Sequence, residues 1–201
     1  MEQQLVLALS LFLVSVCTAR AWPAPDFCHG KQCPEYKLVK KAEGFEERLY
    51  DASEWITTKV EGTESSDLMD ANSRLKAYCK RLNDAGYNFP YDTWPLLITL
   101  KEGKDYWLSW FVPPGTTTLP PESNSTVILE SRPESTVYVR VFGGTPSIKK
   151  GEANASELCK SLEKDCTGTT YSGAGYDSFF SLSHHNEIWI YASDINKSET
   201  P

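Results

Sequence analysis

The chain has 201 residues and a formal net charge of −7, with 23% charged and 12% aromatic residues. This length allows one domain or two small ones, and the composition is that of a folded protein rather than of a disordered or collagen-like chain. The negative charge argues against a nucleic-acid-binding protein, which needs a basic face, and against attraction to anionic membranes.

The first segment is typical of a secretory signal peptide. Residues 5–16 form an apolar run that is interrupted only by two serines and is shorter than the roughly 20 residues needed to span a bilayer. Ala19 and Ala21 follow it with the spacing of a cleavage site. We therefore expect residues 1–21 to be removed and the mature protein to be secreted, extracellular and without stable membrane insertion. A short membrane anchor is the alternative.

The next elements are an irregular arm and the first strands. Residues 22–33 contain prolines and two cysteines, which favours an irregular N-terminal arm. Strands are predicted over residues 36–41 and 45–50, and the second of them is expected to resume over residues 55–60, where β-branched residues are frequent.

An amphipathic helix is the strongest local prediction. Its apolar face is formed by residues at alternating spacings of three and four, namely Leu68, Ala71, Leu75, Tyr78 and Leu82. Ser66 is the expected N-cap, and Gly86 is placed to end the helix.

The second half repeats the order of the first. Strands predicted over residues 94–100 and 106–112 complete the first half. Strands predicted over residues 127–131 and 136–142 begin the second half. A short helix over residues 154–164 begins with Asn154 and Glu157 in the spacing of a capping box. An extended or loop segment over residues 167–176 follows it, and a strand over residues 187–192 comes last. Each half therefore has the order strand–strand–helix–strand–strand, which indicates a duplicated α+β unit.

The cysteines indicate disulfides. Five of them remain after residue 21, and two disulfides with one free thiol are the simplest arrangement in an oxidising compartment. Proximity favours the pairs Cys28–Cys33 and Cys159–Cys166, although spacing alone does not fix the connectivity. Cys79, in the predicted helix, would then be a small buried residue.

Three N-glycosylation sequons begin at Asn124, Asn154 and Asn196. Together with the signal segment they predict a secreted glycoprotein.

Several segments, taken in order, resemble the SOUL/haem-binding protein family. They are Pro34-Glu35-Tyr36, residues 44–50 and 55–58, residues 74–78 and 83–86, residues 132–134 and 137–144, and Asn186-Glu187-Ile188-Trp189-Ile190. The resemblance extends from about residue 33 to 192. It implies a distorted antiparallel β-barrel of two pseudo-repeats flanked by two helices. It also places the domain at residues 34–192 and leaves residues 193–201 as a C-terminal tail.

The resemblance further implies non-enzymatic, non-covalent binding of haem, a related tetrapyrrole or another flat apolar ligand. The expected site is a shallow apolar groove beside the first helix, and its candidate residues are Leu68, Met69, Leu75, Lys76 and Trp94. His184 and His185 are candidate axial ligands of the haem iron, the only metal expected. Core positions are the default interpretation of the leucines, and a solvated loop is the more frequent setting for the histidines. Lys76 also fits a solvated helix face, and Trp94 equally fits the core.

An alternative function is a secreted protein-interaction module that has lost haem binding. Asp92 favours it, because this residue stands where the family pattern has Met. No nucleophile elbow, metalloprotease motif, phosphate loop or dinucleotide fingerprint is present in the sequence, so we do not expect an enzyme.

Overall fold

Nine strands and three α-helices form the part of the chain that the computed structural model describes, residues 22–90, 92–116, 125–178 and 181–197. They are β1 (Tyr36–Ala42), β2 (Phe45–Tyr50), β3 (Ser53–Val60), α1 (Ser65–Asp84), β4 (Leu96–Lys101), β5 (Asp105–Val112), β6 (Val127–Arg132), β7 (Ser135–Phe142), α2 (Ile148–Leu162), β8 (Tyr171–Gly175), β9 (Asn186–Tyr191) and α3 (Ala192–Lys197). The predicted signal peptide and Asn124 lie outside these residues.

The strands form one antiparallel sheet in the order β1-β2-β7-β9-β8-β4-β5-β3-β6. Apart from β1, the sheet has an equivalent order when read from either end. The strands β2, β7, β9 and β8 on one side correspond to β6, β3, β5 and β4 on the other. The units β2-β3-α1-β4-β5 and β6-β7-α2-β8-β9 therefore have the same connectivity, and the strand order is symmetric about the β8–β4 pair. This symmetry agrees with the predicted duplication. Each unit also gives its first strand to the other, because β2 pairs with β7 and β6 pairs with β3.

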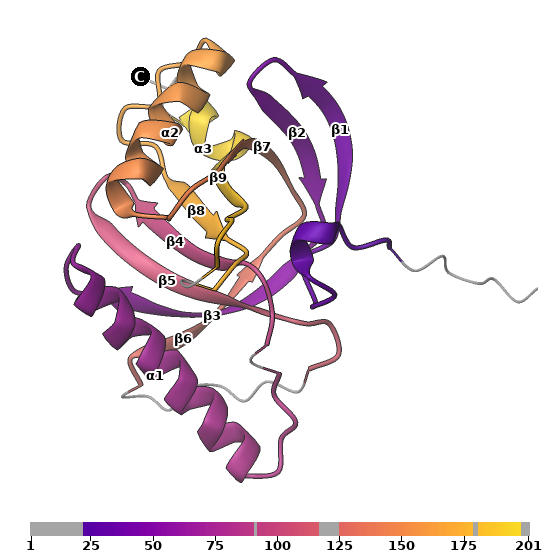
Figure 1. Ribbon diagram of the computed structural model, residues 1–201, viewed down its shortest axis with the longest axis vertical. Helices are drawn as coiled ribbons and strands as arrows, with labels where there is room; N and C mark the ends of the chain where they lie inside the picture. Colours follow the sequence, from indigo (N-terminus) through magenta and orange to yellow (C-terminus); the bar gives the residue numbers. More distant parts are fainter. Residues whose placement is uncertain (1–21, 91, 117–124, 179–180, 198–201) are drawn as a thin grey trace, which may run out of the picture.

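The α+β architecture is confirmed, but a closed barrel is not. The sheet ends at β1 and β6, and no pairing joins these two strands within the described residues. In Figure 1 the β1–β2 hairpin stands at the upper right, while β3 and β6 lie at the bottom of the sheet. Closure into a barrel would require these edges to pair.

The prediction that one strand resumes after residue 50 is wrong. β2 pairs with β1 and β7, whereas β3 pairs with β5 and β6 in the other half of the sheet. The exposed residues Asp51 and Ala52 connect the two strands. The chain thus crosses from one unit to the other within two residues.

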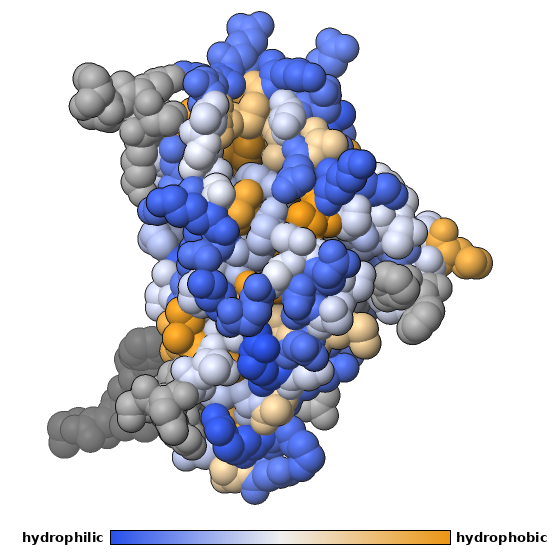
Figure 2. All heavy atoms as spheres, turned by 90° about the vertical axis from the view of Figure 1, so that its left-hand side faces the viewer, coloured by the Kyte–Doolittle hydropathy of each residue, from blue (hydrophilic) through white to orange (hydrophobic). Residues whose placement is uncertain are grey.

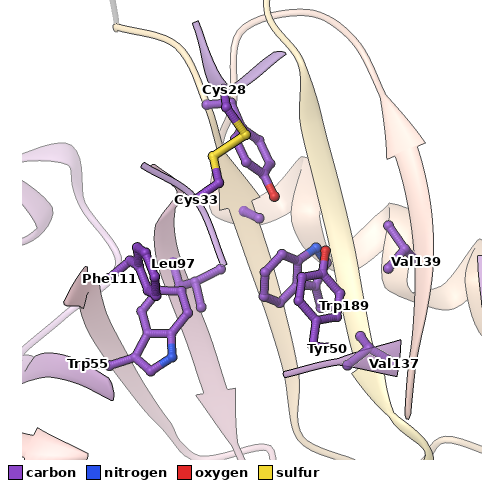
Figure 3. Close-up of a cluster of buried hydrophobic side chains, with 11 residues drawn as sticks. Cys28, Cys33, Tyr50, Trp55, Leu97, Phe111, Val137, Val139 and Trp189 are labelled. Atoms are coloured by element: carbon purple, nitrogen blue, oxygen red, sulfur yellow. A yellow bond between two sulfur atoms is a disulfide. The ribbon is translucent and has the colours of Figure 1, made fainter. Parts of the chain in front are cut away.

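Large aromatic side chains fill one face of the sheet (Figure 3). Trp55 and Trp189 are each only 1% exposed. The ring centroids of Tyr50 and Trp189 are 4.5 Å apart, and those of Trp55 and Phe111 are 5.6 Å apart. The Cys28–Cys33 disulfide belongs to the same buried cluster. The N-terminal arm is therefore part of this core, although its irregular sequence has no periodicity of its own.

The helices cover the opposite face. α1 contacts β3, β5 and β6, while α2 contacts β7, β8 and β9. On β9, Trp189 belongs to the aromatic core, and its neighbours Ile188 and Ile190 pack beneath α2, as the alternation of a strand requires. α3 follows β9 directly and buries Ile195 in the α2 cluster. Within the described residues, none of the helices has the length and apolar character that crossing a membrane would need.

The starts of both long helices differ from the sequence expectation. Glu64, not Ser66, is the N-cap of α1, and it forms a capping box with Asp67. α2 begins six residues before Asn154, and its N-cap Ser147 accepts a hydrogen bond from the backbone N–H of Lys150. Asn154 is therefore inside α2, and the predicted capping role for it is wrong.

Candidate functional site

The groove candidates on α1 have different environments. Leu75 is fully buried in the core beneath the helix, and Leu68 packs at the edge of the same cluster. Met69 is 68% exposed, and Lys76 is also exposed. Met69 and Lys76 are seven residues apart, so they share one side of the helix about 10 Å from each other. With the exposed Ser73 between them, they form a narrow surface that we call the α1 stripe.

Trp94 is not part of this surface. It packs against the aromatic core on the other side of the sheet, next to the N-terminal arm. The backbone N–H of Trp94 donates to the carbonyl of Gln32, and the ammonium of Lys31 lies 4.9 Å from the centroid of its ring. Lys31 also pairs with Asp92. Asp92 thus contacts the arm just before the start of β4.

Figure 2 shows the side of the molecule that lies at the left in Figure 1. Small apolar areas are separated there by hydrophilic side chains, and no single broad apolar surface is present on this side. A flat apolar ligand on this side would therefore meet either a narrow stripe or a recess.

A buried ionic cluster joins side chains of β2 and β9 across β7 and beneath the N-terminal arm. Arg48 is 2% exposed and Glu187 is fully buried, and their Nη1 and Oε1 atoms are 3.0 Å apart. Oε1 is also 2.9 Å from Nε2 of His185. The Tyr176 hydroxyl and the Trp189 indole N–H both donate to Oε2, at 3.0 and 2.7 Å. Each oxygen of the Glu187 carboxylate thus has two partners.

The titration of this cluster follows from burial and from its charges. Burial alone would raise the pKa of Glu187, but the hydrogen bond from His185 and the charge of Arg48 outweigh it and hold the pKa below the ordinary value. Burial, reinforced by the negative charge of Glu187, raises the pKa of Tyr50 and Tyr176 well above the usual range. Both tyrosines therefore remain protonated, and Tyr176 can donate to Glu187.

The N-terminal arm covers this cluster. Phe27 stacks on the His185 ring with centroids 4.1 Å apart and planes within 6° of parallel. Nε2 of His29 lies 3.0 Å from Asp177, whose other oxygen accepts a hydrogen bond from the backbone N–H of His185. Two of the three histidines therefore have a ring nitrogen next to a carboxylate.

These positions bear on the candidate axial ligands. Nε2 of His185 faces Glu187 and its ring is covered by Phe27, so ligation through this atom would require the cluster to open. His184 is half-buried, and its Nδ1 is buried without a hydrogen-bond partner. No group of three or more metal-ligating side chains occurs within the residues that the structure describes.

Sequence reasoning missed the cluster, although a signal was present. Arg48 lies two residues from Tyr50, and Glu187 lies two residues from Trp189. Alternation places both charges on the inward-facing side of their strands. A charged residue at such a position predicts a buried partner, but it does not say which strand supplies it.

Both local disulfides, Cys28–Cys33 and Cys159–Cys166, are present. Asn154 is half-buried in α2, where its Nδ2 donates to the carbonyl of Lys150 at 2.9 Å and its Oδ1 accepts from Arg140 at 3.3 Å. Asn196 lies in α3.

Cys79 is the free cysteine of the described residues, and burial raises its pKa to about 12. Relative to the ordinary value of 9.0, this leaves about a thousandfold less thiolate near neutral pH. We expect iodoacetamide to leave the folded mature protein unlabelled and to label one cysteine after denaturation without reductant. Mass spectrometry counts the labels, and five labels without reductant would contradict both disulfides.

A cavity of about 550 Å³ that is open to solvent lies beside α2. It is bounded by α2, the loop that follows it and the turn between β4 and β5, and apolar side chains of Leu100, Ala155 and Ile190 line it. None of the groove candidates on α1 contributes to it.

The family model and the curated relatives agree with each other. Residues 31–191 match the family model described as SOUL heme-binding protein. The human protein named Heme-binding protein 2 is 27% identical over 190 residues, which cover 89% of this chain and 85% of that protein. The mouse protein of the same name is 28% identical over 167 residues, or 77% of this chain and 79% of that protein. Among solved structures, the C-terminal domain of EcmrR aligns with a TM-score of 0.49 and 9% identity, over 78% of this chain and 96% of that chain.

Proposed function

This chain belongs to the SOUL heme-binding protein family, and on that premise we propose that it is a secreted, non-enzymatic protein that binds haem or a related tetrapyrrole. The observation that carries the proposal is the family match, because residues 31–191 include every strand of the sheet. Both relatives of similar length are named for haem binding.

Secretion is supported by three independent features. The apolar segment at residues 5–16 is followed by a small–x–small pattern, and three sequons are present. The two disulfides fit an oxidising compartment, because such bonds are rare in the cytosol.

We propose the α1 stripe as the contact surface for the macrocycle. Met69 offers an exposed polarisable side chain, and Lys76 offers a cation for a propionate about 10 Å along the helix. Because Nε2 of His185 already faces Glu187, binding would rest mainly on these contacts, and His184 is the candidate axial ligand that a comparison of hemin with iron-free protoporphyrin tests.

Titration of the purified mature protein with hemin tests this function. We expect a shifted Soret band that saturates, and a dissociation constant for iron-free protoporphyrin IX within about threefold of that for hemin. Lys76→Ala should weaken the binding of hemin and of protoporphyrin IX about three- to fivefold, as expected for an exposed ion pair. Lys149→Ala on α2 is the matched control and should change neither.

Two results would count against the proposal. A hemin spectrum indistinguishable from that in the presence of an inert protein would remove haem binding. A preference for hemin over protoporphyrin of more than about tenfold would show that an axial ligand carries the affinity.

The alternative, an interaction module without haem, is favoured by the separation of the groove candidates. Leu68 and Leu75 belong to the core beneath α1, whereas Trp94 belongs to the core beside the arm. Protein isolated from its natural source decides between the two functions: a stable protein partner and no Soret absorbance, combined with a failed hemin titration, support the alternative.

A further inference from the structure

The cavity beside α2 is separate from the surface proposed for haem. α2 packs on β7, β8 and β9, while α1 packs on β3, β5 and β6. We propose that this cavity is a second binding site, for a small, uncharged and largely apolar molecule that carries one hydrogen-bonding group.

The size and lining of the cavity suit such a ligand. Its volume of about 550 Å³ lies within the range of small-molecule sites. Leu100 comes from β4, Ala155 from α2 and Ile190 from β9, so three elements supply the apolar wall. Ala155 is 6% exposed and Ile190 is 1% exposed, which makes this wall continuous with the packed core beneath α2.

The rim of the cavity is held by covalent and hydrogen bonds. The Cys159–Cys166 disulfide links α2 to the loop that forms one side. The β4–β5 turn forms another side, and the backbone N–H of Glu102 in this turn donates to the Thr170 hydroxyl at 3.2 Å. A cavity held in this way is formed before a ligand arrives, which lowers the entropy cost of binding.

One polar group of the lining lacks a partner. Thr169 lines the cavity and is 8% exposed, and its hydroxyl oxygen is buried without a hydrogen-bond partner. Rotation by 120° about the Cα–Cβ bond of Thr169 moves the hydroxyl to another staggered position and loses no hydrogen bond. Because an unpaired buried hydroxyl is unfavourable, a ligand group that bonds to it gains affinity.

The charges at the rim oppose one another. The lining includes Lys160 and Lys164 together with Glu152, Glu163 and Asp165. Lys160 pairs with Glu157 at 2.7 Å, and Asp165 accepts hydrogen bonds from the backbone N–H and hydroxyl of Thr167. Neither sign of charge dominates the rim, so the cavity favours an uncharged ligand.

N-phenyl-1-naphthylamine is a suitable probe, because it is uncharged and apolar, has one N–H group and fluoresces more strongly in apolar surroundings. We expect saturable binding to the mature protein at one probe per chain. Lys160→Trp should weaken binding at least tenfold by filling the mouth from an exposed position on α2. Thr169→Val should weaken binding about three- to tenfold, and Thr169→Ser should restore it.

Two controls separate this site from the proposed haem surface. Met69→Ala should leave probe binding unchanged, and Lys160→Trp should leave hemin binding unchanged. 1-Phenylnaphthalene, which lacks the N–H group, should be insensitive to Thr169→Val. Circular dichroism confirms that each variant is folded.

The proposal is overturned if the probe does not saturate, or if Lys160→Trp leaves its affinity unchanged. It is also overturned if Lys160→Trp weakens hemin and the probe together, because the cavity would then be the haem site. Failure of hemin to bind, with normal probe binding, would reject only the proposed function.

Discussion

Replacing Glu187 by Gln is expected to lower the free energy of unfolding by about 3 kcal/mol or more, the usual cost of breaking a buried ion pair. The carboxylate accepts hydrogen bonds from Tyr176 and Trp189 and lies against Arg48 and His185. An amide cannot accept at all four positions, and it leaves the guanidinium of Arg48 with less compensation. Urea unfolding of both proteins at neutral pH measures the difference.

The same variant tests the direction of the Glu187 pKa shift. The folded pKa lies below the ordinary value, so the ionised carboxylate stabilises the fold above the unfolded pKa of about 4.3. This stabilisation is lost as the pH falls through the folded pKa. We therefore expect the stability gap between wild type and Glu187→Gln to narrow below about pH 4. A gap that stays constant between pH 7 and 3 would contradict the assignment.

A further variant controls for the loss of a carboxylate charge. Glu47→Gln, on the half-buried position next to Arg48, should change stability by no more than about 0.5 kcal/mol. If Glu47→Gln lowers the free energy of unfolding as much as Glu187→Gln does, the buried cluster is not the cause.

Leu75→Ala is expected to lower the free energy of unfolding by about 2–5 kcal/mol, because it opens a cavity in the core beneath α1. Leu75 is fully buried, whereas Met69, six residues earlier on the same helix, is 68% exposed. Met69→Ala should therefore change stability by no more than about 0.5 kcal/mol and should act on hemin binding instead. Thermal and urea unfolding of the two variants distinguish a core residue from a surface residue. Equal losses in the free energy of unfolding would contradict the placement of Leu75 in the core and Met69 on the surface.

Local features were predictable from the sequence, and long-range ones were not. The spacing of apolar residues predicted α1 and its buried face, and the closeness of the cysteines in the sequence predicted both disulfides. Alternation shows which side of a strand is buried, but not which strand lies next to it. For that reason the separation of β2 from β3 was missed.

The candidate site was less predictable, for the same reason. Arg48 and Glu187 come from strands far apart in the sequence, and β7 lies between those strands in the sheet. The role of Asp92 depends on Lys31 in an arm without periodicity. The Asn154 prediction failed because the capping-box spacing also occurs inside a helix, and Ser147 supplied an earlier cap.

The exchange of first strands between the two units has a consequence for the origin of the fold. A single unit of this kind would leave β3 or β7 without the neighbour that the other unit provides. Such a half-length ancestor could complete its sheet only by associating with an identical molecule and trading strands with it. The present chain has the strand order that gene fusion of such an intertwined homodimer would produce.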